Sequence, residues 1–288
     1  MKKNITYGLE RLKDDRDKLI KKTKAVHWAG PSMGYTIDAE DYFRLFLAGR
    51  YLLEGEGHFI IATSSYREII PLNFHVPHGM RKFLAQDIYT FTTNQQFAAV
   101  AEECSKPRKG DDPDGLWIRH RTRAILGQLH AAGKAVSLEV YGDGLDGGII
   151  GLLIGGVFVS LSVFSRRSGA GNAALLAMQA ILCERRFKLH DAIAPSSISR
   201  HFGGHLVSAQ TYHTLSAEAA GMKVDFPTID TPLSVADYIQ PLMRDRNHGR
   251  TFPRQERHAS EEQDGSQARQ NIRQIGARNH GGGQNGPA

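Results

Sequence analysis

The sequence is poor in cysteine and tryptophan, with two residues of each among 288. Cys104 and Cys183 lie far apart, and neither has a metal-ligand spacing around it. This pattern predicts two reduced thiols and argues against a disulfide scaffold or a zinc site. Thirteen histidines do not change that expectation, because no cysteine or carboxylate is spaced to complete a site with their closest pairs. No metal is therefore predicted.

Several other signatures are missing. The chain has no G-x-S-x-G nucleophile elbow and no Walker A loop, which argues against serine hydrolases and P-loop nucleotide hydrolases. The first residues, Met-Lys-Lys-Asn-Ile-Thr-Tyr-Gly, contain no apolar segment of the kind that a secretory signal needs. We therefore expect a cytoplasmic protein.

Charge is unevenly distributed. The chain carries a net charge of +6, but residues 1–24 contribute +5 and residues 244–288 contribute +3, so the middle is close to neutral at −2. Basic ends could dock on nucleic acid or another anionic surface, or could simply keep the protein in solution. Residues 9–24 have the pattern of a charged helix, and the composition of residues 244–288 predicts a disordered tail.

The longest uncharged run extends from Gly147 to Phe164. A membrane-spanning helix needs about 20 apolar residues, so the run is borderline for that role. Its five glycines, two of them adjacent at Gly155-Gly156, and its β-branched second half favour two buried strands over a helix. Strands that are apolar on both faces must be covered on both sides, so the run predicts the centre of an α/β sheet and no membrane partner.

The order of elements around this run indicates a GNAT-like acyltransferase. A strand at 136–141 precedes strands at 149–154 and 157–164, which a glycine turn, a helix at 172–185 and a strand at 187–193 follow. Glycines let backbone N–H groups approach a phosphate, and the next helix directs its positive end toward it. The loop residues predicted to hold a phosphate are Arg166, Gly169, Gly171 and Asn172. The same turn could equally serve only as a strand-to-helix connection.

A longer set of motifs resembles the bacterial leucyl/phenylalanyl-tRNA–protein transferases. The resemblance rests on GLWI, LHAAGKAVSLEVY, GGIIG, SLSVFSR, KLHD and a glycine pair, which lie at 115–118, 129–141, 147–151, 160–166, 188–191 and 203–204. Weaker likeness extends upstream through FLAGRY, REIIP and HVPHGMRKFL, so about residues 40–215 are covered.

The resemblance implies an α+β protein with a small N-terminal domain and a GNAT-like C-terminal domain. We expect an N-terminal basic extension at 1–30, the small domain at 31–110, the acyltransferase domain at 111–243 and the tail at 244–288. The implied partners are an aminoacyl-tRNA, as co-substrate, and the N-terminus of an acceptor protein or peptide. The implied reaction is transfer of leucine or phenylalanine to that amine, with no further cofactor.

The resemblance also implies roles for individual residues. Asp191 falls on the strand carboxylate that orients or deprotonates the attacking amine. Arg81 and Lys82 fall in a basic helix that contacts the tRNA backbone. The aminoacyl pocket is expected beside Ser162, Phe164, Ser165 and Arg166.

The chain also departs from the family pattern. Leu161 stands where the family has a glutamate, and Ile193 stands where it has a glutamine. Ile60 and Ile61 replace paired tryptophans. These changes predict an altered choice of acceptor. Two alternatives remain open: a CoA-dependent N-acyltransferase that binds a CoA thioester on the 166–171 loop, and a catalytically silent binding module.

Overall fold

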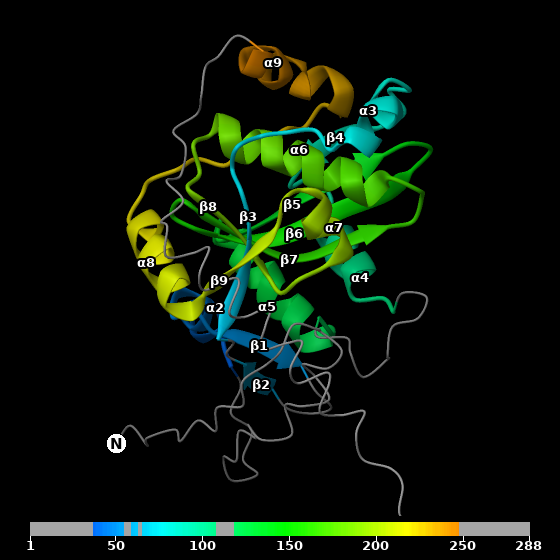
Figure 1. Ribbon diagram of the computed structural model, residues 1–288. Coiled ribbons are helices and arrows are strands. Elements are labelled where there is room, and N and C mark those ends of the chain that lie inside the picture. The colour runs from blue at the N-terminus through cyan, green and yellow to red at the C-terminus, as the bar shows by residue number, and fades with distance from the viewer. Residues whose placement is uncertain (1–36, 55–58, 63–64, 108–117, 248–288) are drawn as a thin grey trace, which may run out of the picture. The chain divides into compact units, whose positions relative to one another are not determined.

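An eight-stranded sheet organises the residues that the computed structural model describes, which are 37–54, 59–62, 65–107 and 118–247 (Figure 1). The helices are α2 (Ala39–Leu47), α3 (His78–Leu84), α4 (Phe97–Cys104), α5 (His120–Ala131), α6 (Ala170–Glu184), α7 (Ser197–His201), α8 (Ala209–Ala220) and α9 (Val235–Asn247). The strands are β1 (Tyr51–Glu54), β2 (Phe59–Ala62), β3 (Tyr66–Ile70), β4 (Thr90–Thr93), β5 (Ala135–Tyr141), β6 (Leu145–Ile154), β7 (Val157–Ser165), β8 (Leu189–Ile193), β9 (His205–Ser208) and β10 (Leu233–Ser234).

The strand order of the sheet is β10-β4-β5-β6-β7-β8-β3-β9. Among the described strands, β7 and β8 form a parallel pair and every other neighbouring pair is antiparallel. Helix α6 makes the crossover between the two parallel strands, as parallel neighbours require. The mixed sheet with its covering helices confirms the predicted α+β class.

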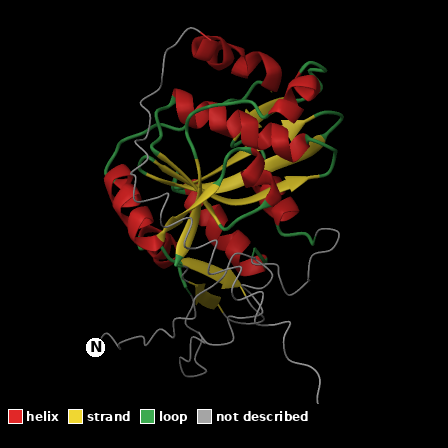
Figure 2. Ribbon diagram, viewed as in Figure 1, coloured by secondary structure: helices red, strands yellow, loops and turns green. Residues whose placement is uncertain are grey.

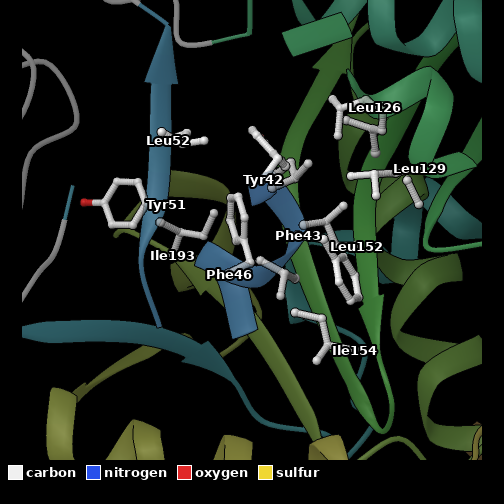
Figure 3. Close-up of a cluster of buried hydrophobic side chains, with 14 of the residues drawn as sticks. Tyr42, Phe43, Phe46, Tyr51, Leu52, Leu126, Leu129, Leu152, Ile154 and Ile193 are labelled. Carbon is white, nitrogen blue, oxygen red and sulfur yellow. The ribbon is translucent and has the colours of Figure 1, made fainter. Parts of the chain in front are cut away.

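Helices cover both faces of the sheet (Figure 2). On one face α6 packs against β5, β6 and β7, with α9 against its outer side, so that nearly all of α6 is buried. The other face carries a core to which α2, β1, α5, β6 and β8 all contribute (Figure 3). Within it, Phe46 and Tyr42 of α2 are buried beside Ile193 of β8. This double cover explains why the central strands tolerate apolar side chains on both faces.

The apolar run is an antiparallel hairpin, as predicted. Strand β6 pairs with β7 from Gly147 opposite Ser165 to Ile154 opposite Val157. Gly155 turns the chain with φ +56°, and a Cβ there would lie 2.2 Å from the Ala220 carbonyl oxygen. Within the described residues, no helix is long and apolar enough to cross a membrane.

The start of α5 depends on a carboxylate from another element. Its N-cap residue, Arg119, provides no side-chain hydrogen bond to the helix. Instead, the buried side chain of Glu54 in β1 accepts the N–H groups of Arg119, Arg121 and Thr122 at 3.2, 3.1 and 2.8 Å. An anion at a helix N-terminus accepts hydrogen bonds from the free N–H groups there and interacts favourably with the helix dipole. Glu54 therefore fixes the β1–β2 hairpin to α5.

Two elements differ from what their sequence pattern predicts. Residues 38–51 have a helical pattern that starts at the N-cap Asp38, but the helix ends at Leu47, because Gly49 at φ +69° turns the chain into β1. Residues 93–104 also have a helical pattern, but the helix begins only at Phe97, because residues 90–93 pair with β5 and β10. The helix expected at 9–24 lies outside the described residues.

The domain boundaries stay a prediction. Strands β3 and β4 precede residue 110 and β5 to β10 follow it, and all eight belong to one sheet. Helix α9 extends to Asn247, beyond the tail boundary expected at 243.

Candidate active site

The candidate site lies where the parallel strands β7 and β8 separate. Their pairing runs from Val157 opposite Leu189 to Val159 opposite Asp191 and goes no further. Strand β7 continues to Ser165, whereas β8 ends at Ile193. The continuation of β7 therefore has no parallel partner, and Asp191 marks the point of separation.

A β-bulge in β7 lies at the same level. Ile150 of β6 pairs with Ser162 and Gly151 pairs with Ser160, so Leu161 is an extra residue. A bulge re-aims the side chains that follow it. Gly151 makes room for this irregularity, since a Cβ there would lie 2.4 Å from the ring of Phe158 and 2.5 Å from the Val159 carbonyl oxygen. The position at which the family resemblance places a glutamate is thus a buried, bulged leucine.

Asp191 is fully buried and its carboxylate has several donors. Oδ2 accepts hydrogen bonds from Arg67 Nη2 at 2.6 Å and from the Tyr212 hydroxyl at 2.8 Å. Oδ1 accepts the N–H of Ile193 at 2.7 Å. Both oxygens of the carboxylate are therefore held by donors of this chain.

Arg67 is the buried counter-ion of Asp191, with 2% of its side chain exposed. Its guanidinium carbon lies 4.7 Å from the centre of the Tyr212 ring and 5.4 Å from that of Tyr51. Burial opposes the charge, but attraction from Asp191 and Tyr212 outweighs it and raises the pKa of Arg67. Burial also raises the pKa of Tyr51 to about 12 and that of Tyr212 further still, so both hydroxyls stay neutral and that of Tyr212 donates to Asp191.

Strand β8 ends in a strained turn. Ile193 has φ +62°, a left-handed conformation that is unfavourable for a β-branched residue. Around it, Ala194 N donates to the Ala192 carbonyl at 2.6 Å, which closes a three-residue turn of a rare kind. The Asp191 carboxylate binds the N–H of the strained residue itself, so the two features form one unit.

The predicted pocket residues of β7 lie just past the separation. Ser162 is buried opposite Ile150, and the Phe164 ring packs directly on Gly148, where a Cβ would lie 2.8 Å from its Cε1 atom. Ser165 is exposed at the end of the strand. The structure thus brings these three residues and Asp191 to one end of two neighbouring strands, and the aminoacyl pocket stays a prediction.

The glycine loop makes several contacts within the protein. Gly169 has φ +84° as the N-cap of α6, and the Phe83 ring would be 2.4 Å from a Cβ there. The N–H of Gly171 donates to Ser165 Oγ at 3.1 Å, and the Tyr89 hydroxyl donates to the Ser168 carbonyl at 2.9 Å. Asn172 lies half-buried in the first turn of α6.

Arg166 points to a carboxylate of this chain. Its Nε donates to Glu103 Oε2 at 2.8 Å and its Nη2 to the other oxygen of Glu103. The hydrogen bonds from Arg166 lower the pKa of Glu103. A CoA pyrophosphate on this loop would have to displace or approach that carboxylate, and it would compete for the Gly171 N–H, so the geometry does not favour the CoA alternative.

The predicted tRNA-contacting helix lies beside the loop. Helix α3 carries Phe83, whose ring contacts Gly169, and it also carries the exposed Arg81. Among the described residues, none forms a hydrogen bond or ion pair with the Arg81 side chain. The Lys82 side chain lies outside the described part of the chain. A role for either residue in tRNA binding remains a prediction.

Sequence reasoning missed Arg67, Tyr212 and the strained turn at Ile193. Arg67 carried a signal, because Arg67 and Glu68 are two adjacent charged residues in a short strand that also contains Ile69 and Ile70. Tyr212 carried none, since it becomes a partner of Asp191 only when α8 folds against β8.

Comparisons with known proteins agree with the motifs. The profile of the family described as leucyl/phenylalanyl-tRNA protein transferase matches residues 69–217. A leucyl/phenylalanyl-tRNA–protein transferase of Thermosynechococcus vestitus is 34% identical over 185 residues, which cover 60% of this chain and 90% of that protein. The protein of the same name from Maricaulis maris is 33% identical over 178 residues, covering 61% and 82%. One from Shewanella baltica is 34% identical over 163 residues, covering 56% and 68%.

Proposed function

Because the chain belongs to the leucyl/phenylalanyl-tRNA–protein transferase family, we propose that it moves a leucyl- or phenylalanyl-type group from an aminoacyl-tRNA to an N-terminal amine of a protein. One observation carries the proposal. The matched residues include β7, the glycine loop, α6 and β8, which together build the strand separation at Asp191.

The reaction is an acyl transfer. The amine nitrogen attacks the ester carbonyl carbon that joins the amino acid to the terminal ribose, and a tetrahedral oxyanion forms. The C–O bond then breaks, the ribose oxygen leaves with the proton that the amine gives up, and an amide remains. Positioning two large substrates can supply much of the rate. In this proposal Asp191 orients or deprotonates the attacking amine, and Ser162, Phe164 and Ser165 border the aminoacyl side chain.

The fold supports a GNAT-like arrangement of the acyltransferase part. The parallel pair β7 and β8, joined through the glycine loop and α6, is the feature expected of that class. We further propose that Arg81 and Lys82 on α3 contact tRNA phosphates, since α3 adjoins the loop through Phe83. Charged tRNA is made and used in the cytoplasm, so we place the protein there.

The acceptor preference is proposed to differ from that of related enzymes. Leu161 and Ile193 replace a carboxylate and an amide, and both are buried apolar residues here. The carboxylate of Asp191 is already paired with Arg67. A basic first residue of the acceptor would therefore find less favourable charge near this site, so uncharged first residues should be accepted better.

Transfer of labelled leucine or phenylalanine from charged tRNA to a peptide panel tests the proposal. The peptides should differ only in the first residue, for example arginine, methionine and alanine, and N-acetylated copies serve as controls. We expect transfer to the free amines only. Failure to transfer to any peptide, together with no tRNA binding at low salt, would refute the function.

Two controls separate the alternatives. Arg81→Ala should weaken tRNA binding and reduce its salt dependence, whereas Arg185→Ala, an exposed arginine at the opposite end of α6, should not. Acetyl-CoA at millimolar concentration should leave the melting temperature unchanged. A clear stabilisation would revive the CoA-dependent reaction.

A further inference from the structure

We infer that Arg67, Tyr212 and Asp191 form a positioning device that holds the strained turn at Ile193, and that Asp191 acts through this turn rather than by taking a proton from the amine. The inference rests on the proposed function, because it concerns how that site is shaped. It assigns a role to Arg67 and Tyr212, which the sequence motifs leave unexplained. It also chooses between positioning and proton abstraction as the role of Asp191.

The Asp191 carboxylate is held on both of its oxygens. Asp191 is fully buried, and its oxygens accept hydrogen bonds from a cation, a hydroxyl and a backbone N–H at 2.6, 2.8 and 2.7 Å. To take up a proton it would have to give up at least part of the pairing with Arg67. A buried guanidinium without its counter-ion is strongly unfavourable. The arrangement therefore suits an anchor that keeps these three partners better than a base that takes up and releases a proton with every turnover.

The Asp191 carboxylate in turn holds the strained turn at Ile193. Oδ1 binds the N–H of Ile193, the residue with φ +62°, and the next N–H closes the turn onto Ala192. Strained backbone persists only where its surroundings determine it, and it gathers at functional sites. Here the surroundings are Asp191, which is itself fixed by Arg67 from β3 and Tyr212 from α8.

The turn at Ile193 also determines where β8 ends. It ends β8 just past the last pairing with β7, so that Ser162 to Ser165 continue without a parallel neighbour. Beyond the turn, Ser196 N donates to Glu68 Oε2 at 3.2 Å and Ser199 Oγ donates to the same oxygen at 2.8 Å. Glu68 is the residue next to Arg67, so β3 fixes the chain on both sides of the turn. The separation of the strands is a consequence of this device.

Paired substitutions distinguish an anchor from a base. Arg67→Met/Asp191→Asn removes both charges of the buried ion pair, so neither is left without its partner. The asparagine Oδ1 can still accept the Ile193 N–H, but the amide cannot act as a base. We expect the transfer rate kcat to stay within about tenfold of the wild type, since only the hydrogen bond to the turn is needed. Loss of a general base would instead lower kcat by about 10²–10⁴-fold, and that result would overturn the inference.

A second pair tests the turn itself. Arg67→Met/Asp191→Ala removes the acceptor, and kcat should fall by at least about 100-fold while KM for the aminoacyl-tRNA changes little. Adding Ile193→Gly should recover at least about tenfold, because glycine adopts a positive φ without strain. Ile154→Gly, which removes an equally buried isoleucine from β6, is the matched control and should give no recovery. Recovery in both triple variants, or in neither, would contradict the inference.

Amide hydrogen exchange of the segment 189–196 gives a readout that needs no activity. Protection should persist in Arg67→Met/Asp191→Asn and be lost in Arg67→Met/Asp191→Ala, with the rest of the sheet still protected. If the wild type transfers nothing but this exchange pattern is found, the proposed function fails and the device stands. If all variants exchange alike, the device is refuted whatever the activity.

Discussion

The β6–β7 hairpin and the β3–β8 pair lie in the same sheet but are stabilised in different ways. The hairpin and α6 bury almost only apolar side chains, such as Ile149, Leu152 and Leu176. The β3–β8 pair buries Arg67, Glu68, His190 and Asp191 in an otherwise apolar setting. Burying a charged group lowers stability unless the group is paired, and buried charged groups cluster at functional sites. The strand pair β3–β8 therefore has the features of a functional site rather than of a structural element.

The largest effect should come from breaking the buried ion pair. Arg67→Met leaves the Asp191 carboxylate buried with no counter-ion, and we expect the free energy of unfolding to fall by about 3–5 kcal/mol. Urea denaturation measures it. Arg167→Met is the matched control, because Arg167 pairs with Asp143, whose side chain is 93% exposed, and its loss should change stability little. Equal effects of the two substitutions would remove the distinction between the buried and exposed pairs.

A smaller effect should follow from overpacking the hairpin. In Gly151→Ala the new methyl group would meet the Phe158 ring and the Val159 carbonyl oxygen, so we expect a loss of about 1–3 kcal/mol. Gly127→Ala is the control, because that glycine is exposed in α5 with open space around it. It should stabilise the protein by about 0.5–1 kcal/mol. If Gly151→Ala were neutral in the same denaturation series, the bulge would not depend on the glycine.

A third effect, smaller than that of breaking the ion pair, is a pH dependence of stability from the other face of β8. Burial lowers the pKa of His190 to about 3, and Gln179 Nε2 lies 2.8 Å from its Nδ1. Between that value and the unfolded pKa of about 6.5 the unfolded chain binds the extra proton, so stability falls as the pH drops below about 6.5. The slope due to this residue approaches about 1.4 kcal/mol per pH unit.

Comparison with His190→Leu isolates that slope from those of other groups. Unfolding free energies of the two proteins should be measured from pH 7 to pH 5. The wild type should lose more stability than the variant over this range. Parallel curves would show that the pKa of His190 is the same in the folded and the unfolded protein, and would contradict the prediction.

The contrast also explains how much could be predicted from sequence. The hairpin, α6 and β8 follow from local patterns, because apolar runs, glycine pairs and helical spacing are read within a few residues. The Asp191 position came from a motif. Arg67 lies 124 positions before Asp191, so no local pattern could pair them, and the left-handed turn falls on an isoleucine, a residue that local rules would not place there. Strand β4 could not be predicted for the same reason, because its partners β5 and β10 are distant in the sequence.

The role of Asp191 as an anchor is tested most directly by the ratio of leucyl-transfer rates between Arg67→Met/Asp191→Asn and Arg67→Met/Asp191→Ala, measured in single turnovers with saturating Leu-tRNA. Residue 191 can form hydrogen bonds with the N–H of Ile193 and with the Tyr212 hydroxyl in the first protein but not in the second, and neither protein has a base there. If Asp191 is an anchor, the asparagine protein is faster by at least about tenfold. Two equally slow proteins, both far below the wild type, would show that Asp191 is needed for its proton affinity and would contradict that role.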